Sequence, residues 1–229
     1  MTEKERKAIL RKAKGFFREM IIPAHLANTQ RLIKKDQFNI NPFLHQYIAS
    51  FVFGDNSKTN LAKALVYPRI MSTSITTTFG TQMQVFCSEV LDGVGSTTPG
   101  IDIEFVDQID GKKKYCQVKS GPQTINKEDV TTITTHFRDL IRRSRSNRNP
   151  VLNDECVVGV LYGEPNKLSA NYKKIQKDYP VYVGQEFWTR LTGDEEFYSK
   201  LAKAFGKVAT EINASKTVNQ VIKELAQDL

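Results

Sequence analysis

Two alternating segments joined by a short polar turn constrain the fold of this chain more than any other feature. Residues 101–106 and 112–119 alternate apolar and polar side chains, which is the period of strands with one buried face. Between them, Asp110-Gly111 is a typical two-residue hairpin turn. We therefore expect an antiparallel β-hairpin whose two faces differ sharply in polarity.

The turn also predicts which residues of the hairpin pair. It places Asp102 opposite Lys119 and Glu104 opposite Gln117, so these four side chains share one face. A slip by one residue would move Lys119 onto the apolar face, so the pattern opposes it. The residues expected on the apolar face are Ile101, Ile103, Phe105, Cys116 and Val118.

The polar face combines the groups that metal-dependent phosphodiester cleavage requires. Such cleavage needs a hard cation, and Mg²⁺ takes oxygen ligands that include one or two carboxylates. We expect Asp102 to be the direct ligand and Gln117 to offer its carbonyl oxygen, while Lys119 orients or deprotonates the attacking water. Because Gln117 is neutral, we expect Glu104 or the upstream Glu89 to supply a second carboxylate.

A purely structural role of this polar face is the alternative. Exposed hairpins often carry opposite charges across the strands, each pair contributing about 0.2–1 kcal/mol. The composition bears on the choice, since 33 basic residues against 25 acidic ones give a net charge of +8. That balance favours an anionic partner such as nucleic acid.

The remaining composition indicates an ordinary globular protein. No run of residues approaches the roughly 18 apolar residues of a membrane helix, and the charged N-terminus is unlike a signal peptide. The three cysteines, Cys87, Cys116 and Cys156, are far apart and odd in number, so we expect reduced thiols in a cytoplasmic protein. The histidines have no zinc-ligand spacing with them.

Residues 1–78 are predicted to form a helical N-terminal region, involved in dimerisation or in contact with DNA. A first helical stretch over residues 3–35 should break or kink at Pro23. A second helix should begin at Asn41-Pro42 and end near Phe53, with a strongly apolar face. We expect that face to be core, with a subunit interface as the alternative.

Residues 79–229 are predicted to form the second region. A helix over 79–91 should carry Glu89, and a helix capped by Asn126 and Asp129 should follow the hairpin. His136 lies off the apolar stripe of that helix, which is typical of a surface histidine. The helix ends in basic residues that either bind phosphates or complement the helix dipole. These basic residues are Arg142, Arg143, Arg145 and Arg148.

The elements that follow predict an α/β fold. A continuous apolar run over 156–162 indicates a strand buried on both faces, and 181–183 a further short strand. Helices are expected over 187–208, divided at Gly193, and over 218–226. A central mixed β-sheet flanked by helices accommodates this order.

With this order of elements, the chain resembles the PD-(D/E)XK nuclease superfamily, in which a strand Asp and an (E/D/Q)-x-K on the next strand bind the metal. More narrowly, it resembles type II restriction endonucleases of the PmeII-like group. The passages that carry the likeness are Leu65-Val66-Tyr67-Pro68-Arg69-Ile70 through Phe79-Gly80-Thr81, Gly100-Ile101-Asp102-Ile103-Glu104-Phe105, Gln117-Val118-Lys119-Ser120-Gly121-Pro122 and Gly184-Gln185-Glu186-Phe187-Trp188.

The resemblance implies a restriction-endonuclease-like core that cuts double-stranded DNA with Mg²⁺ as a homodimer. The family's first acid falls on Asp102, its second position on Gln117, its lysine on Lys119, and the helical glutamate of some members on Glu89. Two departures leave the second carboxylate open, because Ile101 replaces the namesake proline and Gln117 replaces an acid. The alternatives are another nuclease of this superfamily (modification-dependent, repair or junction-resolving) and a DNA-binding module of the same fold that has lost the chemistry.

Overall fold

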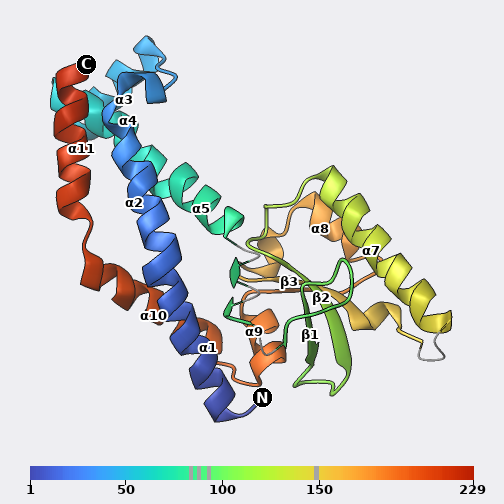
Figure 1. Ribbon diagram of the computed structural model, residues 1–229. Coiled ribbons are helices and arrows are strands. Elements are labelled where there is room, and N and C mark those ends of the chain that lie inside the picture. The colour runs from blue at the N-terminus through green and yellow to red at the C-terminus, as the bar shows by residue number, and fades with distance from the viewer. Residues whose placement is uncertain (83–84, 87–88, 92–93, 147–149) are drawn as a thin grey trace. The chain divides into compact units, whose positions relative to one another are not determined.

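Four strands form one mixed sheet in the order β1-β2-β3-β4 (Figure 1). β1 (Ile103–Val106) pairs antiparallel with β2 (Lys113–Lys119), and β3 (Cys156–Val160) and β4 (Val181–Val183) continue the sheet in parallel. Every residue of β3 is buried, as the sequence predicts, and so is every residue of β4. The mixed sheet flanked by helices is confirmed. The computed structural model describes the whole chain except residues 83–84, 87–88, 92–93 and 147–149.

The chain divides into two compact units, each built from two stretches of sequence. The sheet unit contains residues 1–16 and 83–205, and the helical unit contains residues 17–82 and 206–229. This division differs from a single boundary after a helical region 1–78. The first stretch of the chain accompanies the sheet, and the last stretch accompanies the helical unit.

The register of the hairpin differs from the expected one by two residues. Ile103 pairs with Cys116 and Glu104 with Tyr115, so the expected pairing of Glu104 with Gln117 was wrong. An even shift keeps the residues of β1 and β2 on their predicted faces. The five residues expected on the apolar face are all buried, but Ile101 precedes β1 and packs with Ile133 and Phe137 in a core cluster that does not contain the other four.

A buried aspartate explains why the turn is wider than expected. The N–H of Asp107 donates to the carbonyl of Lys112 (2.9 Å), and the Asp107 carbonyl accepts from the N–H of Gly111 (2.9 Å). The loop therefore spans residues 108–111 instead of the two residues expected. The Asp107 carboxylate, which is 0% exposed, pairs with Arg190 Nη1 at 2.8 Å. Because an unpaired buried charge is costly, this ion pair holds the end of β1 in place.

Helices cover both faces of the sheet. α7 (Lys127–Ser146) and α8 (Ala170–Ile175) lie side by side and share one hydrophobic core with Val158 and the other β3 and β4 side chains on that face (Figure 1). On the opposite face, α9 (Gln185–Thr192) packs Phe187 against the sheet. Gly193 ends α9 with φ +73°, as the sequence predicts. The two faces of the hairpin therefore meet different helices.

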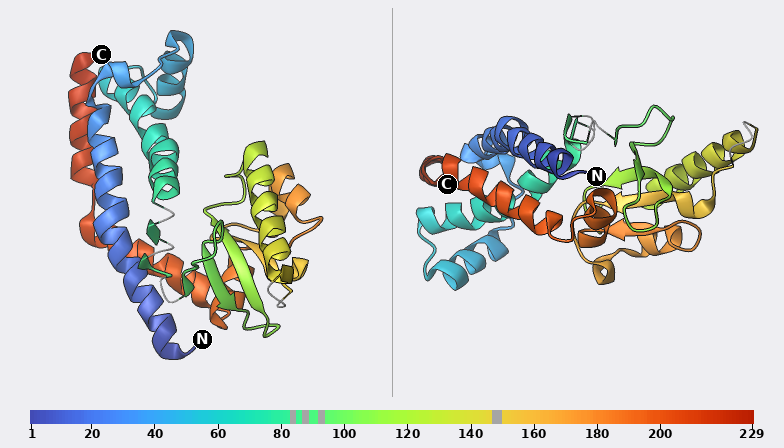
Figure 2. Two further views of the ribbon diagram at one scale, coloured as in Figure 1. Left: turned by 45° about the vertical axis from the view of Figure 1, so that its right-hand side comes forward. Right: turned by 90° about the horizontal axis from the view of Figure 1, so that it is seen from below.

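The helical unit has a hydrophobic core of its own. Leu32, Val66 and Leu225 belong to it, and α11 lies beside α2 and α4 (Figure 2). Residues of α10 (Phe197–Ile212) belong to both units, whereas α1 (Glu3–Phe16) belongs to the sheet unit. The helices of this unit are α2 (Ile22–Gln30), α3 (Pro42–Phe53), α4 (Lys58–Pro68), α5 (Ile75–Thr81) and α11 (Ser215–Asp228).

Two prolines stand beside π-helical segments. Pro23 lies in the first turn of α2, directly after the π segment Phe17–Ile21. Pro68 ends α4 and is followed by the π segment Arg69–Ser74. A proline removes one helical hydrogen bond and crowds the preceding turn, and the wider π turn before Pro23 accommodates both effects. The helical path therefore continues through Pro23, which was expected to break or kink it, and it also continues past Pro68.

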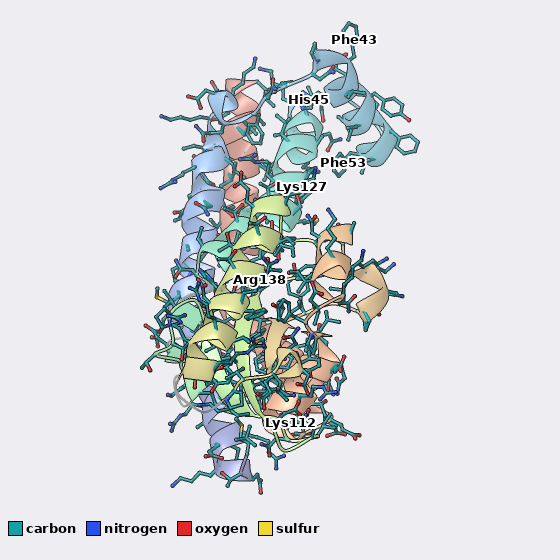
Figure 3. All side chains as sticks on the ribbon, turned by 90° about the vertical axis from the view of Figure 1, so that its right-hand side faces the viewer. Phe43, His45, Phe53, Lys112, Lys127 and Arg138 are labelled. Atoms are coloured by element: carbon teal, nitrogen blue, oxygen red, sulfur yellow. The ribbon has the colours of Figure 1, made fainter. Side chains whose placement is uncertain are left out.

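The apolar face of α3 is exposed, so the expectation that it forms core was wrong. Asn41 caps the helix as expected, accepting from the N–H groups of Phe43 (3.1 Å) and Leu44 (3.3 Å). Phe43 is nevertheless 86% exposed and Phe51 76%, and Figure 3 shows Phe43 at the first turn of α3. We call the exposed set the α3 surface; it consists of Phe43, Leu44, Tyr47, Ile48, Phe51 and Val52.

Two of the cysteines are buried free thiols, as the sequence predicts. Cys116 and Cys156 lie on β2 and β3, and burial raises the pKa of the Cys156 thiol to about 12. Cys87 lies outside the described residues. No helix in the described part of the chain is long and apolar enough to cross a membrane.

Gly159→Ala tests the packing of α9 on the sheet. A Cβ at position 159 would lie 2.4 Å from the Phe187 ring and 2.9 Å from Cys116 Sγ. Because these neighbours belong to a packed core, we expect the free energy of unfolding to fall by about 1–3 kcal/mol, measured by urea denaturation. Gly15→Ala is the matched control, since nothing lies within 4 Å of a Cβ there. It should be neutral or stabilise α1 by up to ~1 kcal/mol. Equal stability of both variants would contradict this packing.

Candidate active site

Asp102 lies immediately before β1. At this point two consecutive residues, Asp102 and Ile103, face a single residue of β2, Cys116. The N–H of Asp102 donates to the carbonyl of Cys116 (3.0 Å), although Cys116 is the pairing partner of Ile103. This is the pattern of a β-bulge, which redirects a side chain. The Asp102 Oδ2 atom accepts a hydrogen bond from the N–H of Val118 at 2.7 Å. The carboxylate therefore lies against β2 between Gln117 and Lys119.

The environment of Asp102 favours its neutral form. Burial raises the pKa of the Asp102 carboxyl group above its ordinary value of 3.8. The Val118 hydrogen bond and the charge of Lys119 act in the opposite direction without outweighing burial. The charged form of a half-buried carboxylate of this kind becomes favourable when a cation neutralises it. Asp102 thus has the electrostatic character of a metal ligand.

Gln117 and Lys119 project from β2 towards α7. Gln117 is 5% exposed, and its Nε2 atom lies 2.9 Å from His136 Nδ1. Lys119 Nζ lies 3.9 Å from Asp129 Oδ1, and its side chain is 28% exposed. The structure thus brings together the three residues on which the sequence prediction depends, and it adds two from α7.

Asp129 and His136 were not predicted to belong to the site. Asp129 was expected only to cap the helix, a role that it has, since Asp129 and Asn126 exchange hydrogen bonds of 2.8 and 2.9 Å. His136 was expected to be a surface histidine. The signal was their spacing, because residues seven apart return to the same helix face. Both lie off the apolar stripe, on the helix that directly follows Lys119.

Glu104 is held by partners outside this group. Ser96 Oγ and Thr98 Oγ1 each donate to Glu104 Oε1 at 2.6 Å, and Lys113 Nζ lies 2.7 Å from Oε2. Burial alone would raise the pKa of Glu104, but the hydrogen bonds from Lys113, Ser96 and Thr98 outweigh it and lower the pKa. These contacts engage both carboxylate oxygens of Glu104, so little of the carboxylate is left to bind a metal ion.

Glu89 is exposed, within a helical stretch only parts of which are described. Among the described residues, no hydrogen bond or ion pair connects Glu89 with Asp102, Gln117 or Lys119. Its role as a second carboxylate therefore stays a prediction.

The predicted phosphate-binding arginines lie towards the C-terminal end of α7. Arg142 donates to Asp139 Oδ1 (3.1 Å), and Arg143 Nε donates to the Asp139 carbonyl (3.2 Å). Arg142, Arg143 and Arg145 are exposed. Arg148 lies outside the described residues. Figure 3 shows Lys127 and Arg138 on the same helix, whose axis carries these arginines about 9–14 Å beyond His136 at 1.5 Å per residue.

Residues 11–213, most of the chain, match the family described as type II restriction endonuclease EcoO109I. The chain belongs to this restriction endonuclease family. No curated protein matches the chain. The family match supports a restriction endonuclease, a hydrolase that acts on DNA, but not the PmeII-like group in particular.

The restriction endonuclease family generally uses Mg²⁺, and the atoms at this site suit that ion. Asp102 Oδ1 and Gln117 Oε1 accept no hydrogen bond from the part of the chain that the structure describes. Both are hard oxygen donors, which Mg²⁺ prefers, and one or two carboxylates are enough for it. The described residues contain no group of three or more His, Cys, Asp or Glu that could hold a metal. The residues therefore fit an ion that takes its other ligands from water and substrate.

Asp102→Asn tests the electrostatics of the site through stability. Because burial raises the pKa of Asp102, the native state binds its proton more tightly than the unfolded state does, and the charged carboxylate lowers stability above that pKa. We expect the Asn variant to be more stable than wild type at about pH 8. The difference should disappear as the pH falls towards the ordinary pKa of 3.8, measured by urea denaturation.

Glu104→Gln is the control of opposite sign. The pKa of Glu104 is lowered, so its charge stabilises the native state above the ordinary value of 4.5, and this contribution is lost as the pH falls below it. The Gln variant should be less stable than wild type at about pH 8. If both variants change stability in the same direction at that pH, the proposed difference between the two carboxylates is wrong.

Proposed function

We propose that this chain is a Mg²⁺-dependent type II restriction endonuclease of the PD-(D/E)XK superfamily, with Asp102, Gln117 and Lys119 as its active site. The observation that carries the proposal is the hydrogen bond from Val118 N–H to the half-buried Asp102 carboxylate, which brings that carboxylate between Gln117 and Lys119. The family match over residues 11–213 supports the reaction class.

Each residue of the site has a separate task in this proposal. Asp102 and Gln117 would hold Mg²⁺, which when bound neutralises charge at the scissile phosphate. Lys119 donates hydrogen bonds that orient the attacking water and stabilise the charge developing on the phosphate oxygens. The water oxygen bonds to phosphorus while the bond from phosphorus to the 3′ oxygen breaks. One water is consumed, and the products are a 5′-phosphate and a 3′-hydroxyl.

Binding of DNA would use the basic surface of the same unit. We assign Arg142, Arg143 and Arg145 to the phosphate backbone, because they are exposed and belong to the helix that supplies Asp129 and His136. Arg142 and Arg143 already contact Asp139, so phosphate would replace part of those contacts. The net charge of +8 has the sign that such a substrate requires.

Lys119→Ala tests the proposed active site. Incubated with long duplex DNA, the wild-type protein should yield discrete fragments with Mg²⁺ and none with EDTA. The variant should cleave at least about a hundredfold more slowly, a loss of ~3 kcal/mol of transition-state stabilisation, while binding DNA in a gel shift. Lys112→Ala removes the same charge from an exposed lysine directly after the hairpin loop, and this variant should cleave normally.

The other outcomes of that experiment each select a different function. A smear in place of discrete bands would keep the nuclease and discard sequence-specific cutting, as in a repair or junction-resolving enzyme. Intact DNA with a normal gel shift would indicate a DNA-binding module without the chemistry. Unimpaired cleavage by Lys119→Ala would remove the assigned site.

We further propose that two copies pair through the α3 surface. Its aromatic side chains include Tyr47 and Phe51, stacked at 5.5 Å between ring centroids. At about 150–200 Å² per large side chain, the exposed fractions of its six residues amount to roughly 700 Å². This approaches the ~800 Å² per partner of a stable interface. A twofold-symmetric dimer would suit a palindromic DNA site cut on both strands.

Replacing Phe43 and Phe51 together by Ser tests this pairing. Because large buried aromatic residues contribute most of the binding energy of an interface, the double variant should be a monomer at micromolar concentration where wild type is a dimer. Light scattering after size exclusion measures this difference, and supercoiled plasmid should be nicked instead of linearised. Met71→Ser, which also removes an exposed apolar side chain, should leave the dimer intact. A monomeric wild type that linearises plasmid would contradict the proposal.

A further inference from the structure

α7 places two side chains against the polar face of the hairpin. Asp129 lies 3.9 Å from the ammonium group of Lys119, and His136 lies 2.9 Å from the amide of Gln117. The two are seven residues apart, two helical turns, so they belong to one face of the helix. The helix therefore contacts two of the three proposed active-site residues, each through its own polar group.

The contact between His136 and Gln117 has a direction. The amide nitrogen Nε2 of Gln117 can only donate, so the Nδ1 atom of His136 must be the acceptor. An accepting Nδ1 requires the neutral imidazole that carries its hydrogen on Nε2. With Nε2 of Gln117 held in this way, Oε1 occupies the other branch of the amide. Only that oxygen can bind a hard cation.

His136 also lies against the turn that leads to Asp102. A Cβ on Gly100 would lie 2.4 Å from His136 Cγ and 2.6 Å from Nδ1, so only glycine fits here. The φ of Gly100 is +79°, which likewise favours glycine. The imidazole is thus held by contacts with Gly100 and Gln117, from the two segments that supply the proposed metal ligands.

We propose that His136 is a positioning residue that sets which atom of the Gln117 amide faces the metal. Without it, the amide can rotate by half a turn and present its NH₂ group, which repels a cation. The imidazole itself touches neither metal nor DNA in this arrangement. The inference rests on the proposed function only in that Gln117 serves as a ligand.

Two replacements that differ only in the place of their acceptor test this role. The side-chain oxygen of Asn can occupy the position of the imidazole Nδ1 atom, whereas that of Gln reaches the position of Nε2. His136→Asn should therefore keep the orientation of Gln117, and His136→Gln and His136→Ala should lose it. Circular dichroism and thermal unfolding of the three variants verify that the fold is retained.

The readout is binding of Mn²⁺ to the protein without DNA, followed by the electron paramagnetic resonance signal of the free ion. We expect His136→Ala and His136→Gln to weaken Mn²⁺ binding about 10–100-fold, the range found when a partner of a metal ligand is removed. His136→Asn should stay within a few-fold of wild type. Binding of DNA in EDTA should not change in any of the three.

The test separates this inference from the proposed function. If the Mn²⁺ affinities follow the acceptor position but wild type does not cleave DNA, the positioning role stands and the nuclease proposal fails. If wild type cleaves DNA and all variants bind Mn²⁺ alike, the positioning role is overturned by itself. A wild-type protein that binds no Mn²⁺ would overturn it as well, because no ligand would then need orientation.

Discussion

Strand β2 is the element on which the rest of the sheet unit depends. It is hydrogen-bonded on both sides, antiparallel to β1 and parallel to β3, so its position is fixed from two directions. Its alternation sends Cys116 and Val118 towards α9 and Gln117 and Lys119 towards α7. One strand thus joins the core beneath α9 to the face that carries the candidate active site. A change of register in β2 would disturb both together.

The sequence predicted the faces of this hairpin correctly from Ile103 onward, but not the side of Ile101 or the register. Faces depend on the alternation of apolar and polar residues, which a shift of two positions leaves unchanged. Register depends on where the turn closes, and here the turn is set by Asp107, which is buried and paired with Arg190. Those residues are 83 positions apart in the chain. No local pattern contains that contact, so the local signal at Asp110-Gly111 was misleading.

The hydrophobic pattern predicted burial correctly only where the surface that covers the apolar residues belongs to the same chain. The run of β3 is apolar on both faces and is buried on both, between α7 and α9. The apolar face of α3 has an equally strong pattern, yet it is exposed. Hydrophobic periodicity shows that a face should leave water, but it does not say which surface covers it. His136 shows the same limit for polar residues, since its position beside Gln117 depends on how α7 crosses the sheet.

The scarcity of negative charge at the candidate site has a thermodynamic consequence. With Glu104 engaged by Ser96, Thr98 and Lys113, the cation is offered the Asp102 carboxylate and the neutral amide of Gln117. Such a site would bind Mg²⁺ less tightly by itself than with DNA, whose phosphate oxygens would supply further ligands. Binding of metal and of DNA would then be reciprocally linked, each raising the affinity for the other by the same factor. The free protein would have the lower affinity for the cation, and the hydrolytic centre would be complete only on its substrate.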